Sequence, residues 1–442
     1  MKTIVAKFGG SSLSDAEQFK KVKQIILEDK ARRYIVVSAP GKRHRGDSKV
    51  TDILYMCQQL ASHHMRFDEI FDLVRARYTS IVEELALSLD IDSILQEVYT
   101  AIADGASRAF CASRGEYMNA LLLADYLGFP FVDAKELIHF ERADRLQDER
   151  TRMAITEKLR PLDCAVIPGF YGSGATEPIL CFSRGGSDVT GAILADALHA
   201  DLYENWTDVS GFLAADPSIV PEAVPMEQIT FTELRELSYM GASVMHEEAI
   251  FPLRRLGIPV RIRNTDEPNA FGTLITPDDT AADRTGLITG LAGKKDFSVF
   301  TINKLRMAED ASFFRKLLSV FESNDVPVAH MPSAIDSISI IAEDRYINGK
   351  AKRIAEEIRI YCAPDSVEIT HGLAMIAVVG RGMIHTKGIS ARIFTALADN
   401  DINIRVITQG SSEINIIIGV ENKDFEPAIA AIYYAFDERM RI

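Results

Sequence analysis

The chain has 442 residues, of which 47% are hydrophobic and 25% are charged, values typical of a globular protein with room for several domains. Acidic residues outnumber basic ones, 63 to 49, and the net charge of −14 argues against broad binding to nucleic acid or anionic membranes. The sequence shows neither a signal peptide nor an apolar run of membrane-spanning length, so we expect a cytoplasmic protein.

The five cysteines are odd in number and widely spaced. They show neither a zinc-binding spacing nor a disulfide framework, and this pattern predicts buried thiols in a reducing compartment. His63, His64 and His246 also lack partners at metal-ligand spacing. We therefore expect these side chains to have structural roles.

The first predicted element is a strand over residues 3–8, followed by a Gly-Gly-Ser-Ser loop at 9–12. Apolar residues at helical spacing come next, and Ser14 with Glu17 forms a capping box for that helix. Lys7 ends the strand and would face the crevice where open α/β sheets bind ligands. A lysine so close before such a loop favours a phosphate contact over a solvated surface position.

A second strand is predicted at 34–37, and a basic loop at 41–48 follows it. The loop is not a P-loop, because Asp47 stands where that motif needs lysine. We expect the loop to be mostly solvated, and the alternative that it closes over a site as a lid stays open. Amphipathic helices are predicted over 56–112. A further helix would then place Glu116 in its first turn, where the helix dipole favours a carboxylate.

Strand candidates at 129–133 and 164–168 precede the most informative stretch of the chain. That stretch reads as a buried strand at 178–182, a polar turn with two glycines, and a helix that runs to residue 198. Two glycines let the backbone turn sharply and approach a ligand closely. The N–H groups at the helix start favour an anion, most often phosphate.

Two charged side chains lie in this turn. Arg184 can hold a carboxylate through two parallel hydrogen bonds, and Asp188 can hold an ammonium group or a hydrated metal ion. One short turn therefore offers contacts for a zwitterionic amino acid and for a phosphoryl group. The alternative is a surface loop with an Arg–Asp ion pair.

A strand at 200–206 leads into the loop 207–211, whose small polar residues suit the base and ribose of a nucleotide. A late strand follows at 258–263. This repeated strand–helix alternation predicts one large, mostly parallel, three-layer domain. The polar stretch 278–295 marks its expected end.

The remaining third of the chain contains an internal repeat. Asn324-Asp325 corresponds to Asn400-Asp401, an offset of 76 residues (400 − 324), and the same offset pairs Met307 with Met383. Each copy reads as strand, loop, helix, strand, turn, strand. We expect the loops after the first strands to be ligand pockets or, in the alternative, the repeat to serve dimerisation alone. The repeat does not determine how the two copies interleave.

These motifs together resemble those of aspartate kinases, members of the amino-acid kinase family. The resemblance rests on the segments 7–12, 115–116, 184–188, 206–208 with 216–217, and 241–242 with 246, and it covers essentially the whole chain. It implies an α/β protein with a three-layer α/β/α amino-acid kinase fold and a mainly parallel sheet over 1–294. It also implies two C-terminal ferredoxin-like ACT units (βαββαβ) at 295–370 and 371–442.

The resemblance implies transfer of the ATP γ-phosphoryl group to the β-carboxylate of L-aspartate, giving 4-phospho-L-aspartate at the start of lysine, threonine and methionine synthesis. The attacking carboxylate has a reference pKa of about 3.9 and is ionised at neutral pH, so no general base is needed. Catalysis then consists of aligning two anions and neutralising charge on the transferring group. Mg²⁺ would be held by the ATP phosphates, with Asp188 as a further possible contact.

By resemblance, Lys7 would stabilise the β- and γ-phosphates, Arg184 would hold the substrate α-carboxylate, and Asp188 would orient the substrate ammonium or the Mg²⁺ hydration shell. The ATP site would comprise Lys7, Gly9, Gly10, Ser11, Gly186, Thr207, Asp208, Gly211, Phe212 and Asp216. The aspartate site would comprise Ser38, Thr51, Glu116, Arg184, Ser187 and Asp188. Effector contacts would come from Met307, Ser312, Phe313, Val328, Asn403, Ile404 and Gln409.

The sequence departs from the family pattern at three places. Ser243 replaces a lysine expected near the nucleotide, and Leu213 follows Phe212 where relatives often carry tyrosine, which leaves the adenine contacts open. Residues 331–336 replace a Ser/Thr-rich turn common in lysine-responsive enzymes. Lysine is the expected effector, with threonine as the alternative, and ACT units imply a homo-oligomer.

Two other functions remain as alternatives. One is a different carboxylate or carbamate kinase of the same fold, which the tandem C-terminal units disfavour. The other is a catalytically weak amino-acid sensor, which only Ser243 supports. Retention of Lys7, Arg184 and Asp188 argues against the sensor.

Overall fold

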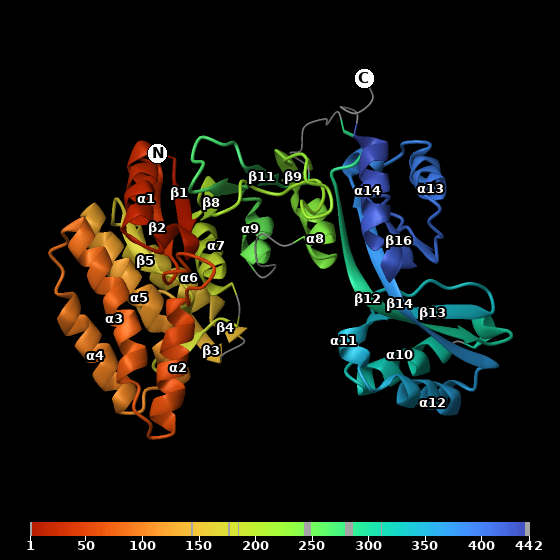
Figure 1. Ribbon diagram of the computed structural model, residues 1–442, viewed down its shortest axis with the longest axis horizontal. Coiled ribbons are helices and arrows are strands. Elements are labelled where there is room, and N and C mark those ends of the chain that lie inside the picture. The colour runs from red at the N-terminus through yellow and green to blue at the C-terminus, as the bar shows by residue number, and fades with distance from the viewer. Residues whose placement is uncertain are drawn as a thin grey trace. The chain divides into compact units, whose positions relative to one another are not determined.

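The structure is a computed structural model that describes residues 2–142, 145–175, 177–183, 185–242, 249–278, 286–310 and 312–437. The chain divides into two units, both drawn in Figure 1. The first unit consists of Met1–Phe212, Pro225–Thr232 and Ser243–Ala282, and the second of Leu213–Val224, Glu233–Ala242 and Asp283–Ile442. The chain therefore passes repeatedly from one unit to the other.

A seven-stranded sheet in the order β5-β2-β1-β8-β10-β11-β9 forms the centre of the first unit. Its strands are Ala165–Pro168 (β5), Arg32–Val37 (β2), Ile4–Phe8 (β1), Leu202–Thr207 (β8), Val260–Asn264 (β10), Thr273–Thr276 (β11) and Gln228–Thr230 (β9). From β5 to β10 every neighbouring pair is parallel, and β11 runs antiparallel to β10. All residues of β1 are buried, as expected of a central strand covered on both faces.

Helices cover both faces of this sheet, so the predicted three-layer α/β fold is confirmed. On one face lie Ala16–Glu28 (α1), Val50–Ser62 (α2), Asp68–Leu85 (α3), Ile91–Ala103 (α4) and Arg108–Leu127 (α5), which share one apolar core with Phe8, Val37 and Trp206. The other face is packed by Gly186–Leu198 (α7), with Asp148–Leu159 (α6) and Ile250–Leu256 (α9) against it (Figure 1). Short 3₁₀ helices occur at Ser11–Leu13 (η1) and Ala134–Glu136 (η2).

A smaller four-stranded sheet has the order β4-β3-β6-β7. Its strands are Arg145–Leu146 (β4), His139–Arg142 (β3), Tyr171–Gly174 (β6) and Leu180–Cys181 (β7). The strand expected at 178–182 is thus only two residues long and belongs to this sheet. It still leads through the Gly-Gly turn into α7, so the predicted order of strand, turn and helix is confirmed.

The predicted cap of the first helix is wrong. The N-cap is Asp15, whose carboxylate accepts a hydrogen bond from the Gln18 N–H at 3.0 Å. The Ser14 hydroxyl donates to the Asp15 carboxylate at 2.9 Å instead of capping the helix. An ionised carboxylate one residue later is the stronger acceptor, which explains why it takes the position.

Two further local predictions are wrong. Helix α5 begins at Arg108, capped by the Ser107 hydroxyl, so Glu116 lies well inside the helix and the dipole of a first turn does not act on it. The segment 129–133 forms no strand but a single bridge from Phe131 to Val166. The glycine at 115 does not mark a helix start. It allows α5 to pack closely against Ala39, because a Cβ at this position would lie 2.7 Å from the Ala39 Cβ.

The second unit is built on one five-stranded sheet in the order β13-β12-β14-β16-β15. The strands are Gly290–Asn303 (β12), Ser337–Glu343 (β13), Ser366–Val379 (β14), Val406–Thr408 (β15) and Asn415–Glu421 (β16). The helices are Phe313–Ser323 (α10), Asp344–Ile347 (α11), Ala351–Cys362 (α12), Ile389–Asp399 (α13) and Phe425–Phe436 (α14), with 3₁₀ helices at Met307–Glu309 (η4), Arg381–Met383 (η5) and Asn422–Asp424 (η6) (Figure 1).

The repeat is visible in these bounds. Strands β12 and β14 begin 76 residues apart (366 − 290), and helices α10 and α13 also begin 76 residues apart (389 − 313). The two copies interleave by sharing the sheet, because β12 and β14 pair antiparallel from Gly290 opposite Val379 to Asn303 opposite Ser366. The boundaries expected at 294/295 and 370/371 fall inside these two strands.

Two segments from the middle of the chain also belong to the second unit. In Leu213–Val224, the side chains of Ala215, Val220 and Ala223 are buried in the apolar core of the second repeat. The Val224 N–H donates to the Tyr433 hydroxyl at 3.1 Å. Helix Phe231–Tyr239 (α8) continues from the first unit into the second.

All five cysteines are free thiols. Cys57, Cys111 and Cys362 are buried as predicted, whereas Cys164 and Cys181 are partly exposed. Among the helices that the structure describes, none is long and apolar enough to cross a membrane.

Candidate active site

Lys7 lies near the carboxyl end of β1 and is only 8% exposed, so it is not a solvated surface lysine. Its Nζ is 2.6 Å from Asp188 Oδ1, in the first turn of α7, and 3.2 Å from Asn205 Oδ1 on β8. The Asn205 Nδ2 group donates to the same Asp188 oxygen at 3.2 Å. The three polar groups form a closed triangle at the point where β1, β8 and α7 meet.

The turn after β1 requires glycine for space. A Cβ on Gly10 would lie 2.7 Å from the Ala39 carbonyl oxygen, and the Gly10 carbonyl accepts from the Gly41 N–H at 2.8 Å. The Gly9 N–H is already bonded to the Trp206 carbonyl at 2.9 Å. The Gly10 N–H, in contrast to that of Gly9, has no hydrogen-bond partner among the described residues. The turn can therefore offer the Gly10 amide to an anion.

The start of α7 is packed closely against Phe170, a residue with a strained backbone. Gly185 has φ of +58°, in the left-handed region, and a Cβ on Gly186 would lie 2.6 Å from the Phe170 ring. Phe170 itself has φ of +79°, and its N–H donates to Thr190 Oγ1 at 3.1 Å. Strained backbone of this kind concentrates at functional sites. The first turn of α7 also packs against the chain that follows β5, since a Cβ on Gly169 would lie 2.7 Å from the Ser187 Cβ.

Glu116 is a buried carboxyl group from α5. Burial raises its pKa to about 8, against the opposing effect of a hydrogen bond from the Ala39 N–H, and its Oε2 has no partner among the described residues. In the same helix, the Asn119 amide donates to the Ser38 carbonyl at 2.7 Å. Thr51 lies in the first turn of α2 and is half-buried. A buried carboxyl oxygen without a donor is suited to receive an ammonium group.

Four of the five residues predicted to bind the nucleotide from the end of β8 onwards lie in one stretch of the first unit, and they are Thr207, Asp208, Gly211 and Phe212. The Thr207 hydroxyl donates to Asp208 at 3.1 Å, and the Phe212 N–H donates to the Thr273 hydroxyl at 2.8 Å. Gly211 has φ of +104°, which requires glycine. Asp216 lies in the second unit instead, is exposed, and accepts from the Ser218 N–H and hydroxyl at 2.8 and 2.6 Å.

Two predicted positions lie outside the described residues. They are Arg184, expected to hold a carboxylate, and Ser243, which departs from the family pattern. His246 lies outside them as well.

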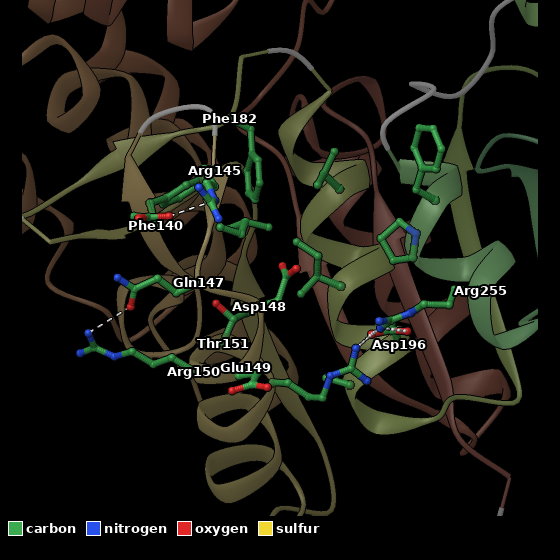
Figure 2. A pocket seen from close by; sticks show the side chains of 18 of the residues that line it. Phe140, Arg145, Gln147, Asp148, Glu149, Arg150, Thr151, Phe182, Asp196 and Arg255 are labelled. Carbon is green, nitrogen blue, oxygen red and sulfur yellow. Dashed lines mark hydrogen bonds and ion pairs between the residues drawn. The ribbon is translucent and has the colours of Figure 1, made fainter.

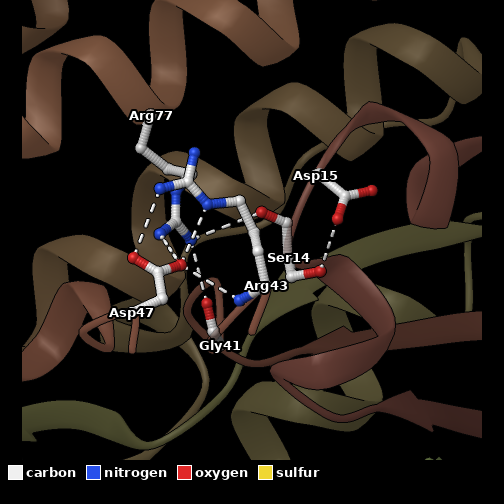
Figure 3. Close-up of polar contacts among 6 residues, drawn as sticks. All are labelled: Ser14, Asp15, Gly41, Arg43, Asp47 and Arg77. Atoms are coloured by element: carbon white, nitrogen blue, oxygen red, sulfur yellow. Dashed lines mark hydrogen bonds and ion pairs between the residues drawn. The ribbon is translucent and has the colours of Figure 1, made fainter. Parts of the chain in front are cut away.

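The basic loop at 41–48 is tied to α3 in the first unit (Figure 3). The Asp47 carboxylate accepts from Arg43 Nε at 2.9 Å and from Arg77 NH2 at 2.5 Å. Arg77 is 4% exposed, and its NH1 also donates to the Gly41 carbonyl at 2.9 Å. Hydrogen bonds from Arg43 hold the pKa of Asp47 well below its usual range. A loop with this anchor is ordered at its base, and its exposed side is basic.

A cavity of about 1330 Å³ lies beside the site rather than at it (Figure 2). It is lined by Phe182, Ser183 and the later turns of α7, with residues of β4, α6 and α9 opposite. Two of its arginines pair with one carboxylate: Asp196 accepts from Arg152 at 2.6 Å and from Arg255 at 2.8 Å. None of Lys7, Asp188, Asn205 and Glu116 lines this cavity.

In the second unit, a cavity of about 250 Å³ lies at the start of α13. Gln409 is the one predicted effector residue that lines it. Glu413, Thr386 and Ser390 add further polar groups to the lining. Other predicted effector residues have structural contacts: Met307 and Phe313 belong to the apolar core of the first repeat.

Two residues of the site were missed by sequence reasoning. Asn205 interrupts a buried strand just before Trp206, and this polar residue in a central strand is the signal that could have found it. Arg114, whose charge opposes the rise in the pKa of Glu116, is 7% exposed and lies over the rings of Phe110 and Tyr117 at 4.6 and 4.3 Å, with no ion pair among the described carboxylates. No sequence pattern indicates its aromatic surroundings.

The arrangement combines three chemical capacities. Lys7 and the glycine turn can hold an anion, the start of α7 adds the Gly186 and Ser187 amides, which have no partner among the described residues, and Glu116 can accept an ammonium group. Such a set of groups can hold a phosphoryl group and an amino acid near the carboxyl ends of parallel strands, where open α/β sheets bind ligands. No nucleophilic side chain with an adjacent base is present among the residues placed here.

The comparisons agree with this geometry. The model of the amino acid kinase family matches residues 2–264, and that of the ACT domain matches residues 376–436. Aspartokinase 3 of Bacillus subtilis (strain 168) is 36% identical over 449 residues, covering 98% of each chain. Chloroplastic aspartokinase 1 of Arabidopsis thaliana is 28% identical and covers 99% of this chain and 80% of its own.

Solved structures give the same result. The crystal structure of aspartate kinase from Clostridium acetobutylicum has a TM-score of 0.90 and 50% identity, covering 99% of this chain and 100% of that one. E. coli aspartokinase III in complex with aspartate and ADP has a TM-score of 0.75 and 25% identity, covering 98% and 99%. The chain therefore belongs to the amino acid kinase family and, within it, to the aspartate kinases.

Proposed function

We propose that the protein transfers the γ-phosphoryl group of ATP to the β-carboxylate of L-aspartate, giving 4-phospho-L-aspartate and ADP. The observation that carries the proposal is the Lys7–Asp188–Asn205 triangle beside the glycine turn, in a chain similar over its whole length to an aspartokinase crystallised with aspartate and ADP. The acceptor carboxylate is ionised at neutral pH, so the chemistry requires alignment and charge neutralisation rather than a base.

Each residue then has a role. Lys7 and the Gly10 amide neutralise charge on the transferring phosphoryl group. Arg184 holds the α-carboxylate of aspartate. Glu116, with its unpartnered Oε2, receives the ammonium group in a pocket completed by Ser38, Thr51 and Ser187.

Mg²⁺ fits this site as a companion of ATP. Among the described residues no three His, Cys, Asp or Glu side chains come together as ligands, so the ATP phosphates would supply most of its coordination. Asp188, beside Lys7, is the carboxylate placed to contact its hydration shell. When bound, Mg²⁺ neutralises negative charge on the phosphates.

We further propose that lysine regulates the enzyme through the second unit. E. coli aspartokinase III, 25% identical, has also been crystallised with lysine and aspartate. In this chain the cavity at the start of α13 pairs the Glu413 carboxylate with polar groups of Gln409 and Ser390, a set suited to an amino acid with a second ammonium group. We expect the C-terminal units to join copies of the chain in a homo-oligomer.

The test measures ADP release from Mg-ATP with aspartate, glutamate and carbamate in parallel, each with and without lysine or threonine. Aspartate-dependent turnover that lysine suppresses supports both proposals. Turnover that no amino acid suppresses supports the kinase and contradicts the regulatory proposal. Absence of turnover with all three acceptors contradicts the kinase.

A further inference from the structure

Asn205 occupies a position that usually carries an apolar side chain. Strand β8 lies between β1 and β10 in the parallel part of the sheet, and the side chain of Asn205 is 2% exposed. An amide buried without hydrogen bonds costs free energy. Its partners must therefore explain why an amide is present.

Both ends of the amide are used, and each contacts a charged group. Oδ1 accepts from the Lys7 ammonium at 3.2 Å, and Nδ2 donates to the Asp188 carboxylate at 3.2 Å. Turning the amide over would direct its N–H groups at the ammonium and its oxygen at the carboxylate. Both contacts would then be repulsive, so the two charges fix one orientation of the amide.

The backbone holds Asn205 at this point. Lys7 and Asn205 are register partners across β1 and β8, so their side chains leave the same face of the sheet side by side. Tyr203, two residues earlier on that face, donates its hydroxyl to the Asp188 carbonyl at 3.3 Å. Two side chains of β8 thus hold Asp188, one at its main-chain carbonyl and one at its carboxylate.

The arrangement leaves part of Lys7 unused. A lysine ammonium has three N–H donors. One contacts Asp188, one contacts Asn205, and no third acceptor is found in the part of the chain that the structure describes. The amine lies beside the glycine turn, since a Cβ on Gly9 would be 3.6 Å from Nζ. One N–H is therefore left for an anion bound at that turn.

We propose that Asn205 is a positioning residue for phosphoryl transfer. Its amide holds the Lys7 ammonium and the Asp188 carboxylate in one fixed arrangement, so that the remaining N–H of Lys7 meets the transferring group. A lysine paired only with a carboxylate would keep the freedom of its four-carbon stem. The inference rests on the function proposed above and adds a residue to which no role is assigned there.

The first test is Asn205→Leu, which keeps the side-chain size and removes both hydrogen bonds. We expect kcat to fall about ten- to a hundredfold, because an orienting contact is lost in the transition state, while the KM for ATP changes less than about threefold. A kcat within twofold of the parent value contradicts the inference.

The matched control is Asn324→Leu in the second unit. Asn324 is 4% exposed, and its amide also makes two hydrogen bonds, to the Val320 carbonyl at 2.8 Å and to Glu357 at 2.7 Å. We expect this variant to lose thermal stability as Asn205→Leu does, but to keep its kcat. A comparable fall in kcat in both variants would assign the effect of Asn205→Leu to stability and contradict the inference.

The second test is Asn205→Asp, which has the same shape and does not depend on how Asn205→Leu folds. Its carboxyl group faces Asp188 closely, and two such groups share a proton. The protonated form again offers an acceptor to Lys7 and a donor to Asp188. We expect activity relative to the parent to be highest near pH 6 and to fall by about tenfold or more towards pH 8.

A ratio of activities that does not vary with pH contradicts the inference, because ionisation of the introduced carboxyl group would then disturb the contacts with Lys7 and Asp188 without changing turnover. The parent is assayed alongside with aspartate, glutamate and carbamate. No ADP from the parent contradicts the proposed function, and with it this inference. An active parent with an equally active Asn205→Leu variant contradicts the inference alone.

Discussion

Glu116 shows how burial turns an ordinary carboxylic acid into a group that titrates near neutral pH. Its pKa is raised to about 8 because burial disfavours the charged form, and hydrogen bonds from the Ala39 and Glu116 N–H groups and the charge of Arg114 offset this only in part. In the proposed reaction the substrate ammonium would replace the missing solvation. Binding of aspartate should therefore be linked to loss of a proton from Glu116.

This linkage predicts a pH-dependent KM. Since the ionised carboxylate is the form that attracts an ammonium group, the KM for aspartate should fall as pH rises from 6 to 8, by up to about tenfold per unit. Glu116→Gln should raise the KM and remove this dependence. Steady-state kinetics from pH 6 to 9 measure both, and a parent KM that is constant over this range contradicts the role of Glu116.

The same shift predicts an effect on stability. Because the folded pKa lies above the unfolded value, the protonated group stabilises the fold below about pH 4.5, and this contribution is lost as pH rises to about 8. The Tm of Glu116→Gln minus that of the parent should therefore increase from pH 5 to pH 8. Differential scanning calorimetry checks the sign.

Lys7 permits the most direct prediction at this scale. We expect Lys7→Ala to lower kcat/KM by about a hundredfold or more, because a charged contact to the transferring group is lost. Arg184→Ala should do the same by removing the clamp on the substrate. Well-folded Lys7→Ala protein with near-normal turnover would rule out the role assigned to Lys7.

The residues predictable from sequence were those in short motifs. Lys7 and Asp188 stand next to glycine turns, and the structure brings them within 2.6 Å. Asn205 and Arg114 could not be predicted in the same way, because their roles depend on what faces them across the sheet or in the core. The prediction for Glu116 failed in its reason: burial, not a helix dipole, sets its pKa.

Among the elements, the loop at 41–48 is the one whose behaviour the sequence leaves open. Its base is fixed to α3 by Asp47 and Arg77, which are 11% and 4% exposed as side chains. Hydrogen bonds from Arg43, helped by the charge of Arg77, lower the pKa of Asp47, so the ionised carboxylate contributes stability at neutral pH, and this contribution is lost only as pH falls below the usual aspartate range. The loop is therefore anchored under all ordinary assay conditions.

Breaking this anchor should free the loop. We expect Arg77→Leu to lower the free energy of unfolding by about 3 kcal/mol, as for other buried ion pairs that lose one partner, and to speed trypsin cleavage after the exposed Lys42 and Arg45. The control is Arg66→Ala, whose ion pair with Asp68 is exposed and should contribute less than about 1 kcal/mol. Equal cleavage rates in parent and Arg77→Leu would contradict the anchoring role.

At the scale of elements, periodicity located most strands and helices but not their ends. The cap moved from Ser14 to Asp15, and α5 began before Gly115 rather than at it. Both errors have one cause: a local residue type indicates a boundary, but competing acceptors and close packing decide where the boundary falls. The tandem repeat was predictable because its period survives in the sequence.

The whole molecule shares its cores between distant parts of the chain. Residues Leu213–Val224 and Glu233–Ala242 belong to the second unit, although first-unit segments follow each of them. Sequence patterns assign segments to domains by proximity along the chain and could not predict this exchange. It follows that neither unit is a continuous piece of chain that can be separated at one point.

This exchange predicts the outcome of truncation. A protein that ends at residue 282 would expose the apolar side chains of Val220 and Ala223, which are buried in the second unit. We expect it to aggregate or to bind a hydrophobic dye, whereas the full chain does not. The single tryptophan, Trp206, is buried in the first unit and reports its packing by fluorescence. A soluble truncated protein with native Trp206 emission would contradict this prediction.

The shared sheet of the second unit has a consequence for how the two repeats can diverge. Each of β12 and β14 is the other's neighbour over most of its length, so a change in register in one copy must be matched in the other. The loops and helices of the two copies do not pair with each other in this way, so a change in one copy need not be matched in the other. Over generations one copy is free to lose or alter its ligand pocket while the paired strands keep both copies in the same frame.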